Sequence, residues 1–482
     1  MRKANGRKKK NCTTITLDVL PDCLIYKILS YLPFKEAAQM SILSKTWLQA
    51  WLIHPNLEFT LPYLKVVDSF MERYRDGKIP IEKFELSDSA GSSQGFPSID
   101  KWIDIALQNG VKYLVFKVAS ISLPIFTILA AKSLRELVLE GCTLNMPVSL
   151  TSGIANCDSL RKLSLSCVSL DEHMLQTLLS SCPLIVNFIL KDCDGLEKIE
   201  LLNLQKIKSV FISTQRNLPV KIRAPTLEHL SYSGYLSDEL DVVECQNLIF
   251  LDVSYVLTSD GFLQHLISRF QSLKVLKIQY CGDNLEIDSP NLVSFEYVRD
   301  QIPEHKIVIE SRKLKHSKIV LHCYDYLNDA WFCKLRKFLS NSTSWSQVSL
   351  YFPKCNEINM KDLQLHHRVA TPQVDILNVN ILWQNAQCPT FVDALLWSCH
   401  PRRLNLHSSI KMITCFICRL MYMKNSSQSF SQRSKPWHSH QLMEIKVFDG
   451  KNQPLQLRNG ELAISTLTDW KEVSFLLDWQ CS

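Results

Sequence analysis

Apolar residues recur along most of this chain in one short pattern, at positions i, i+3 and i+5, with longer and more polar segments in between. The last two positions of each copy are two residues apart, which is typical of a β-strand with one buried face. Successive clear copies begin 19 to 30 residues apart. They are Ile81-Phe84-Leu86, Val111-Leu114-Phe116, Leu134-Leu137-Leu139, Leu160-Leu163-Leu165, Ile185-Phe188-Leu190, Ile207-Val210-Ile212, Leu227-Leu230-Tyr232, Leu248-Leu251-Val253, Leu273-Leu276-Ile278 and Leu292-Phe295-Tyr297.

This spacing is close to the roughly 20–29 residues of leucine-rich repeats. Three copies carry a cysteine at i+8 (Cys142, Cys193 and Cys281), where such repeats place Asn or Cys with the side chain turned inward. Weaker copies begin at His316, Trp345, Val374, Pro401 and Leu442. Because stacked units share one continuous core, we expect an α/β fold: a curved solenoid with parallel strands on its concave face and irregular helices on its convex face.

The segment from Leu20 to Trp51 follows a helical period instead. Leu20-Pro21-Asp22 offers a proline and an acid at a helix start, where a fixed φ and negative charge are both favourable. Pro33 ends this helix and a second one follows. The apolar stripes, at steps of three and four, are Leu24, Ile25, Ile28, Leu29 and Leu32, then Met40, Leu43, Trp47 and Trp51. Because domains below about 40 residues rarely support a core alone, the segment predicts a docking surface.

This segment resembles an F-box of the plant type, written LPDD-x3-ILS-x-LP…LSK-R-W-x3-W. The matching residues are Leu20, Pro21, Ile28, Leu29, Ser30, Leu32, Pro33, Leu43, Ser44, Lys45, Trp47 and Trp51. Cys23 replaces a second acid, Gln39 a common Arg, and Thr46 an Arg that the family prefers. The resemblance implies docking to a Skp-family adaptor, and through it to a cullin. The residues that it implies for this contact are Leu20, Pro21, Ile25, Ile28, Leu29, Leu32, Pro33, Leu43 and Trp47.

An F-box followed by such repeats resembles the plant F-box/leucine-rich-repeat family, some members of which carry an FBD region near the C-terminus. We therefore expect four parts along the chain. They are a disordered basic tail (1–14), a small helical F-box (15–57), a leucine-rich-repeat array (58–410) and a C-terminal cap that resembles an FBD region (411–482).

Positive charge is concentrated at the N-terminus. Of the net charge of +7, the six basic residues among the first ten supply +6, so about +1 remains for the rest. This balance argues against a broad phosphate-binding face and a nucleic-acid partner. The basic run is either a nuclear-import signal or a solvated tail.

The lack of a visible secretory signal and the cysteine content predict a location inside the cell. No secretory signal is visible, and no apolar run reaches the ~20 residues of a membrane helix. The 17 cysteines fit buried thiols in a reducing compartment. We expect a nuclear or cytoplasmic location, or both, with no membrane partner.

Catalytic chemistry is not predicted. None of the motifs GxxxxGK[ST], GxGxxG, GxSxG and HExxH occurs. Cys415 and Cys418 form a CxxC, but His438 and His440 match no common zinc spacing and the flanking residues are apolar. We expect no enzyme activity, no cofactor and no metal site.

A binding surface remains as the candidate site. On the expected concave face most side chains are mixed polar, whereas Ile189, Phe211 and Phe250 are apolar and either mark a partner site or lie under neighbouring loops. The resemblance implies a substrate-recognition subunit of a Skp–cullin–F-box ubiquitin ligase that binds an unknown target protein. Two alternatives with the same architecture are a small-ligand, hormone-like co-receptor and a non-ligase scaffold that binds the adaptor.

Overall fold

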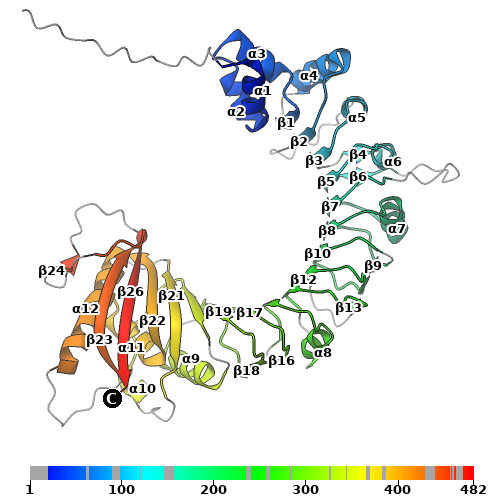
Figure 1. Cartoon of the computed structure of the whole chain (residues 1–482). Helices are drawn as coiled ribbons and strands as arrows, with labels where there is room; N and C mark the ends of the chain where they lie inside the picture. Colours follow the sequence, from blue (N-terminus) through cyan, green and yellow to red (C-terminus); the bar gives the residue numbers. More distant parts are fainter. Residues whose placement is uncertain are drawn as a thin grey trace, which may run out of the picture. The chain divides into compact units, whose positions relative to one another are not determined.

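The computed structural model describes residues 20–481 except 61–63, 89–97, 120, 146–156, 203, 235–239, 257–260, 283–284, 305, 325–326, 343–344, 365–369, 383–386, 429–439, 456, 459–460 and 463–469. The expected basic tail therefore lies outside the described residues. The chain forms two compact units, the first from residues 1–197 and 204–207 and the second from residues 198–203 and 208–482. Each unit contains its own ladder of parallel strands (Figure 1).

The first unit opens with three short helices, α1 (Asp22–Ser30), α2 (Phe34–Met40) and α3 (Lys45–Leu52). Prolines immediately precede α1 and α2, where a locked φ is compatible with a helix start and the missing N–H is not needed. Ser44 caps α3, since its hydroxyl accepts a hydrogen bond from the Trp47 amide. Local sequence signals thus set the boundaries of all three helices.

A parallel ladder follows in the same unit. Its strands, in spatial order, are β1 (Asn56–Thr60), β2 (Lys83–Ser87), β3 (Tyr113–Lys117), β5 (Glu136–Glu140), β7 (Lys162–Ser166) and β8 (Asn187–Lys191). The connections contain α4 (Leu64–Gly77), α5 (Ile99–Gln108), α6 (Ile125–Leu129) and α7 (Glu172–Ser181), with the short strands β4 (Ser122–Leu123) and β6 (Thr143–Leu144). Asp171 caps α7, because its carboxylate accepts a hydrogen bond from the Met174 amide at 2.7 Å.

The second unit continues the same design. Its parallel strands are β10 (Ser209–Ser213), β12 (His229–Ser233), β14 (Phe250–Ser254), β15 (Val275–Gln279), β17 (Ser294–Arg299), β19 (His316–His322), β20 (Gln347–Phe352), β21 (Gln373–Ile381) and β22 (His400–Ser409). The connections contain β9 (Ile199–Leu201), β11 (Val220–Arg223), β13 (Leu240–Val243), β16 (Leu285–Asp288), β18 (Ile307–Glu310), α8 (Phe262–Ser268), α9 (Asp329–Asn341), α10 (Met360–Gln364) and α11 (Pro389–Ser398). Irregular helices therefore alternate with short strands, as expected.

The ladder of the second unit changes direction after β22. The helix α12 (Ile410–Gln428) leads to β23 (His440–Asp449), the short pair β24 (Leu457–Arg458) and β25 (Glu461–Leu462), and β26 (Trp470–Cys481). β26 lies between β22 and β23 and runs antiparallel to both (Figure 1). The copy that begins at Leu442 is therefore not a repeat strand. It belongs to β23, which runs in the same direction as β22 but is separated from it by β26, and a local apolar pattern carries no information on which strand lies beside it.

The core of each unit is a register of matched apolar residues. In the first unit Leu114, Leu137, Leu163 and Phe188 lie opposite one another on neighbouring strands, each fully buried. In the second unit the same row is Leu230, Leu251, Leu276 and Phe295. These are the i+3 residues of the repeat, so the period in the sequence corresponds to one row of the core.

Two of the three cysteines at i+8 link neighbouring repeats. The Cys281 thiol donates to the Val253 carbonyl at 3.5 Å, and the Cys193 thiol donates to the Leu165 carbonyl at 3.5 Å, in each case on the preceding strand. Cys142 and Cys281 are fully buried, whereas Cys193 is partly exposed.

Among the described residues no helix is both long and apolar enough to cross a membrane.

Loss of one member of the core row should cost much more than loss of an exposed leucine. Leu276 is fully buried, whereas Leu382 is 44% exposed. We expect Leu276→Ala to lower the free energy of unfolding by about 2–5 kcal/mol, because it leaves a cavity. Leu382→Ala should change it by less than about 0.5 kcal/mol. Urea unfolding followed by circular dichroism measures both, and equal shifts would contradict a shared core row.

Thiol reactivity should separate the inward cysteines from the surface ones. Burial raises the pKa of Cys142 to about 12 and that of Cys281 to about 11, whereas Cys23, Cys167 and Cys418 are exposed. We expect iodoacetamide at pH 8 to label the three exposed thiols, and to label the buried pair only in denaturant. Peptide mass spectrometry reads out each site. Because an unfolded thiol has a pKa near 8.5, the fold should also lose stability as pH rises from about 8.5 towards these folded values.

Candidate binding surfaces

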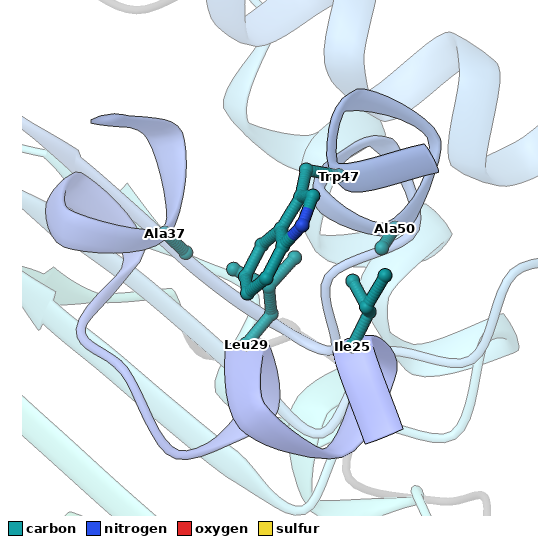
Figure 2. Packing of buried hydrophobic residues seen from close by; sticks show 5 residues of the cluster. All are labelled: Ile25, Leu29, Ala37, Trp47 and Ala50. Carbon is teal, nitrogen blue, oxygen red and sulfur yellow. The ribbon is translucent and has the colours of Figure 1, made fainter. Parts of the chain in front are cut away.

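The three N-terminal helices enclose a small apolar core. It consists of Ile25, Leu29, Ala37, Trp47 and Ala50, each no more than 2% exposed. Figure 2 shows the Trp47 indole lying over Leu29, with Ala37 on one side and Ile25 and Ala50 on the other. Leu20, Leu32, Met40 and Trp51 pack against this cluster from its edges.

Burial divides the residues expected to contact an adaptor. Ile25, Leu29 and Trp47 belong to the core just described, where they hold the helices together from inside, and their part in an adaptor contact stays a prediction. Leu20 and Leu32 are half-buried at the edge of that core. Pro21, Ile28, Pro33 and Leu43 are exposed, and their contact with an adaptor stays a prediction.

Four exposed apolar residues, Leu24, Tyr31, Ile42 and Leu48, are absent from the predicted adaptor contacts. We define the outer F-box surface as Leu24, Ile28, Tyr31, Ile42, Leu43 and Leu48, which are 38–85% exposed. Leu24, Ile28 and Tyr31 follow one another at steps of four and three, so they form a second stripe on α1 beside the buried one. Ile42 and Leu43 lie in the turn before α3, which packs against α1. Exposed apolar side chains at this density are typical of a protein–protein contact.

An aromatic cluster joins the helices to the first repeat. The Phe34 ring lies 5.9 Å from Trp51, 5.4 Å from Phe59 on β1 and 6.0 Å from Phe70 on α4, measured between ring centroids. Trp51 and Phe59 also contact Phe70, at 5.2 and 5.7 Å. These rings come from α2, α3, β1 and α4, so the cluster spans the boundary between helices and ladder.

His54 completes this junction from within. The side chain is 1% exposed, and its Nε2 lies 2.9 Å from the Leu29 carbonyl oxygen on α1. Its Nδ1 lies 2.7 Å from the Asn56 carbonyl oxygen on β1, and the Tyr74 hydroxyl on α4 donates to the His54 carbonyl at 2.7 Å. One buried residue therefore binds α1, β1 and α4 to one another, which favours a rigid rather than a hinged connection.

The three apolar residues expected on the strand face lie in different units. Ile189 is half-buried on β8 of the first unit, opposite Ser164. Phe211 and Phe250 are half-buried on β10 and β14 of the second unit. The Phe250 ring lies 5.9 Å from both the His229 ring and the Lys277 ammonium nitrogen. Neighbouring side chains therefore cover part of Phe250, and its role in partner binding stays a prediction.

Charged side chains on the same face are paired across strands. In the first unit Lys83 lies 2.7 Å from both Glu58 and Glu85, and Lys117 lies 2.9 Å from Glu85. Burial works to raise the pKa of Glu85, but its lysine partners outweigh burial and leave that pKa below the usual range. In the second unit Glu296 pairs with Lys277 and Lys318 in the same way. Because these lysines and glutamates neutralise one another, the ion pairs add little net charge to the face.

Potential metal ligands are scattered in the part of the chain that the structure describes. No cluster of three potential metal ligands occurs there. Cys415 and Cys418 lie on α12, Cys415 buried and Cys418 exposed, and burial raises the pKa of Cys415 to about 11. His438 lies outside the described residues.

Two family models match the chain. The model described as F-box domain matches residues 17–59. The model described as At1g61320/AtMIF1, LRR domain, matches residues 75–255. The expected F-box and leucine-rich repeats are thereby confirmed.

Curated relatives from Arabidopsis thaliana agree with these matches. The F-box/FBD/LRR-repeat protein At1g78750 is 28% identical over 263 residues, 49% of this chain and 56% of that protein. The FBD-associated F-box protein At5g38590 is 30% identical over 276 residues, 54% of this chain and 65% of that protein. The FBD-associated F-box protein At5g22730 is 23% identical over 364 residues, 69% of this chain and 70% of that protein.

The chain thus spans little more than half the length of the first of these relatives. An FBD region within residues 411–482 stays a prediction, although these three relatives carry FBD in their names. The chain thus carries an F-box in its N-terminal helices and leucine-rich repeats behind them, and it is similar to F-box/leucine-rich-repeat proteins of a plant.

Proposed function

We propose that this protein is the substrate-recognition subunit of a Skp–cullin–F-box ubiquitin ligase. The observation that carries the proposal is the outer F-box surface, whose apolar side chains stay exposed although the helices that carry them already pack a core. A domain that is already folded and still exposes such side chains has a surface available for an adaptor. Burying these side chains would supply the affinity, at roughly 25 cal/mol for each Å² of apolar surface.

The proposed mechanism is proximity. The repeats would hold a target protein near the conjugating enzyme that the adaptor and cullin bring, which raises the effective concentration of the reacting groups. A rigid junction supports this role because it fixes the direction in which the repeats leave the F-box. The Phe34 cluster and His54 supply that rigidity within the first unit. In this proposal the chain itself makes and breaks no bond.

The two alternatives differ in what happens to a bound protein. A ligase subunit shortens the half-life of its target, whereas a scaffold binds the adaptor and leaves that half-life unchanged. A hormone-like co-receptor shortens it only when a small ligand is added. Measuring target abundance in cells with and without the protein therefore distinguishes the three.

Charge placed on the outer F-box surface should abolish adaptor binding without unfolding the domain. Ile28 and Leu43 are 38% and 42% exposed, so Ile28→Asp with Leu43→Asp leaves the core intact. We expect binding to a purified Skp-type adaptor to fall at least about tenfold, because unpaired carboxylates would be buried in the contact. Isothermal titration calorimetry measures the affinity, and circular dichroism checks the fold.

Two controls sharpen this test. Leu382→Asp places one such charge on a similarly exposed leucine outside the F-box and should leave adaptor affinity unchanged. Trp47→Ala should lose binding together with the fold, since it removes the centre of the core at a cost of about 3–5 kcal/mol. Full binding by the folded Ile28→Asp/Leu43→Asp variant would show that the adaptor uses another surface.

Restoring the family pattern should strengthen the contact. Cys23 is exposed in the first turn of α1, and Thr46 is half-buried at the start of α3. We expect Cys23→Asp with Thr46→Arg to raise adaptor affinity several-fold. Aspartate should also stabilise α1 by about 0.3–1 kcal/mol, because a negative charge is favourable at a helix N-terminus. Cys23→Ser is the neutral control, and unchanged affinity in the double variant would count against a role for these positions.

A further inference from the structure

Five aromatic side chains form a continuous strip on the second unit. We define the aromatic strip as Tyr255, Tyr280, His322, Tyr324 and Tyr351. The Tyr280 ring stacks on Tyr255 with 4.8 Å between centroids and 11° between planes, and on His322 at 6.2 Å and 14°. His322 in turn lies 6.1 Å from Tyr324 and 4.9 Å from Tyr351. The strip therefore runs from the end of β14 to β20.

These rings are available to a partner. Tyr255, Tyr324 and Tyr351 are 48%, 69% and 38% exposed, so the strip is not part of the core. The Tyr280 hydroxyl lies 2.9 Å from His322 Nδ1, which fixes the centre of the strip and leaves its two ends open. A surface of this kind is already ordered, so binding a partner would cost little conformational entropy.

Backbone conformation supports a role beyond packing. Tyr255 and Tyr280 have φ angles of 59° and 54°, in the left-handed region that bulky residues seldom adopt. The equivalent positions in the first unit, Cys167 and Asp192, have φ angles of 51° and 49°. The turn is thus a property of the repeat, and what distinguishes the second unit is that tyrosines occupy it at two successive strands.

Two carboxylates near the strip, Asp252 and Asp300, have no Lys or Arg partner among the described residues. Asp252 accepts hydrogen bonds from Gln279 and Ser254, at 3.0 and 3.5 Å, and Asp300 lies 3.9 Å from His322. Lys277 faces Asp252 across the ladder but pairs with Glu296 instead. Among the described residues no Lys or Arg lies within ion-pair distance of Asp252 or Asp300.

We propose that the aromatic strip, with Asp252 and Asp300, binds an arginine-bearing segment of a protein partner. A guanidinium group is planar, so it stacks on a tyrosine face while its N–H groups donate to a carboxylate. The open faces of Tyr255 and Tyr324 offer the first contact, and Asp300 offers the second. The chain uses the same stacking internally, since the Arg419 guanidinium lies 4.9 Å from the Tyr422 ring centre.

The carboxylates select this partner over two others that aromatic rings can bind. A nucleic acid could stack its bases on the tyrosines, but Asp252 and Asp300 would repel its phosphates. A proline-rich segment could lie on the rings without using either carboxylate. The claim that the strip binds a degradation target rests on the proposed ligase function, whereas the claim that it binds an arginine peptide does not.

Peptide binding to the full-length protein tests the proposal directly. The probes are fluorescein-labelled octapeptides of four arginines alternating with four glycines, and matched peptides with lysine, glutamine or proline in place of arginine. We expect fluorescence anisotropy to show the arginine peptide binding at least about tenfold tighter than the glutamine or proline peptide, and about threefold tighter than the lysine peptide. Equal affinity for arginine and any of the other three would overturn the proposal.

Substitutions locate the binding on the strip. Tyr255→Ala with Tyr324→Ala should lower the affinity for the arginine peptide about tenfold, at roughly two- to fivefold for each ring. Asp300→Asn should lower that affinity a further few-fold. Tyr26→Ala, which removes a 38% exposed tyrosine that belongs to neither the outer F-box surface nor the strip, is the control and should leave the affinity for the arginine peptide unchanged. Unaltered peptide affinity in a folded strip variant would place the contact elsewhere. Because strip variants should bind the Skp-type adaptor normally, failure here is distinguishable from failure of the proposed ligase function.

Discussion

The whole protein depends on one constraint, which is that no repeat can bury its own apolar face. Most strands of the ladders are only five or six residues long, and each offers two or three inward side chains. These side chains leave water only when the next strand lies in the same register, as Leu137 does between Leu114 and Leu163. Stability therefore accumulates between neighbours, and the exposed face can vary without disturbing it.

Because the core is periodic and the exposed face is not, the sequence predicts the buried strands well and the surfaces poorly. The i, i+3, i+5 pattern identifies the strands and their buried residues because burial there is strictly periodic. The helical pattern of α1 does not decide which of its two adjacent apolar stripes faces inward. In the structure Ile25 and Leu29 are buried, whereas Leu24 and Ile28 are exposed. The aromatic strip was equally hidden, since its members are brought together by the ladder from positions as distant as Tyr255 and Tyr351.

Function and framework meet at the boundary between the F-box and the first strand. His54 makes contacts with backbone groups of α1 and β1, and Tyr74 reaches back to it from α4. A receptor that works by proximity needs this kind of joint, because a flexible one would spread the target over many positions and lower its effective concentration. The aromatic rings around Phe34 contribute the packing, and the buried hydrogen bonds contribute the orientation.

The position of β26 has a consequence for the order of events during synthesis. This strand, residues 470–481, lies between β22 and β23, yet it leaves the ribosome after both. Until it arrives, β22 presents the open edge of a long parallel ladder and β23 has no neighbour on that side, which is the situation that invites pairing between chains. The growing chain therefore has an edge open to pairing until residues 470–481 have been made, and a chain truncated before residue 470 would keep that edge.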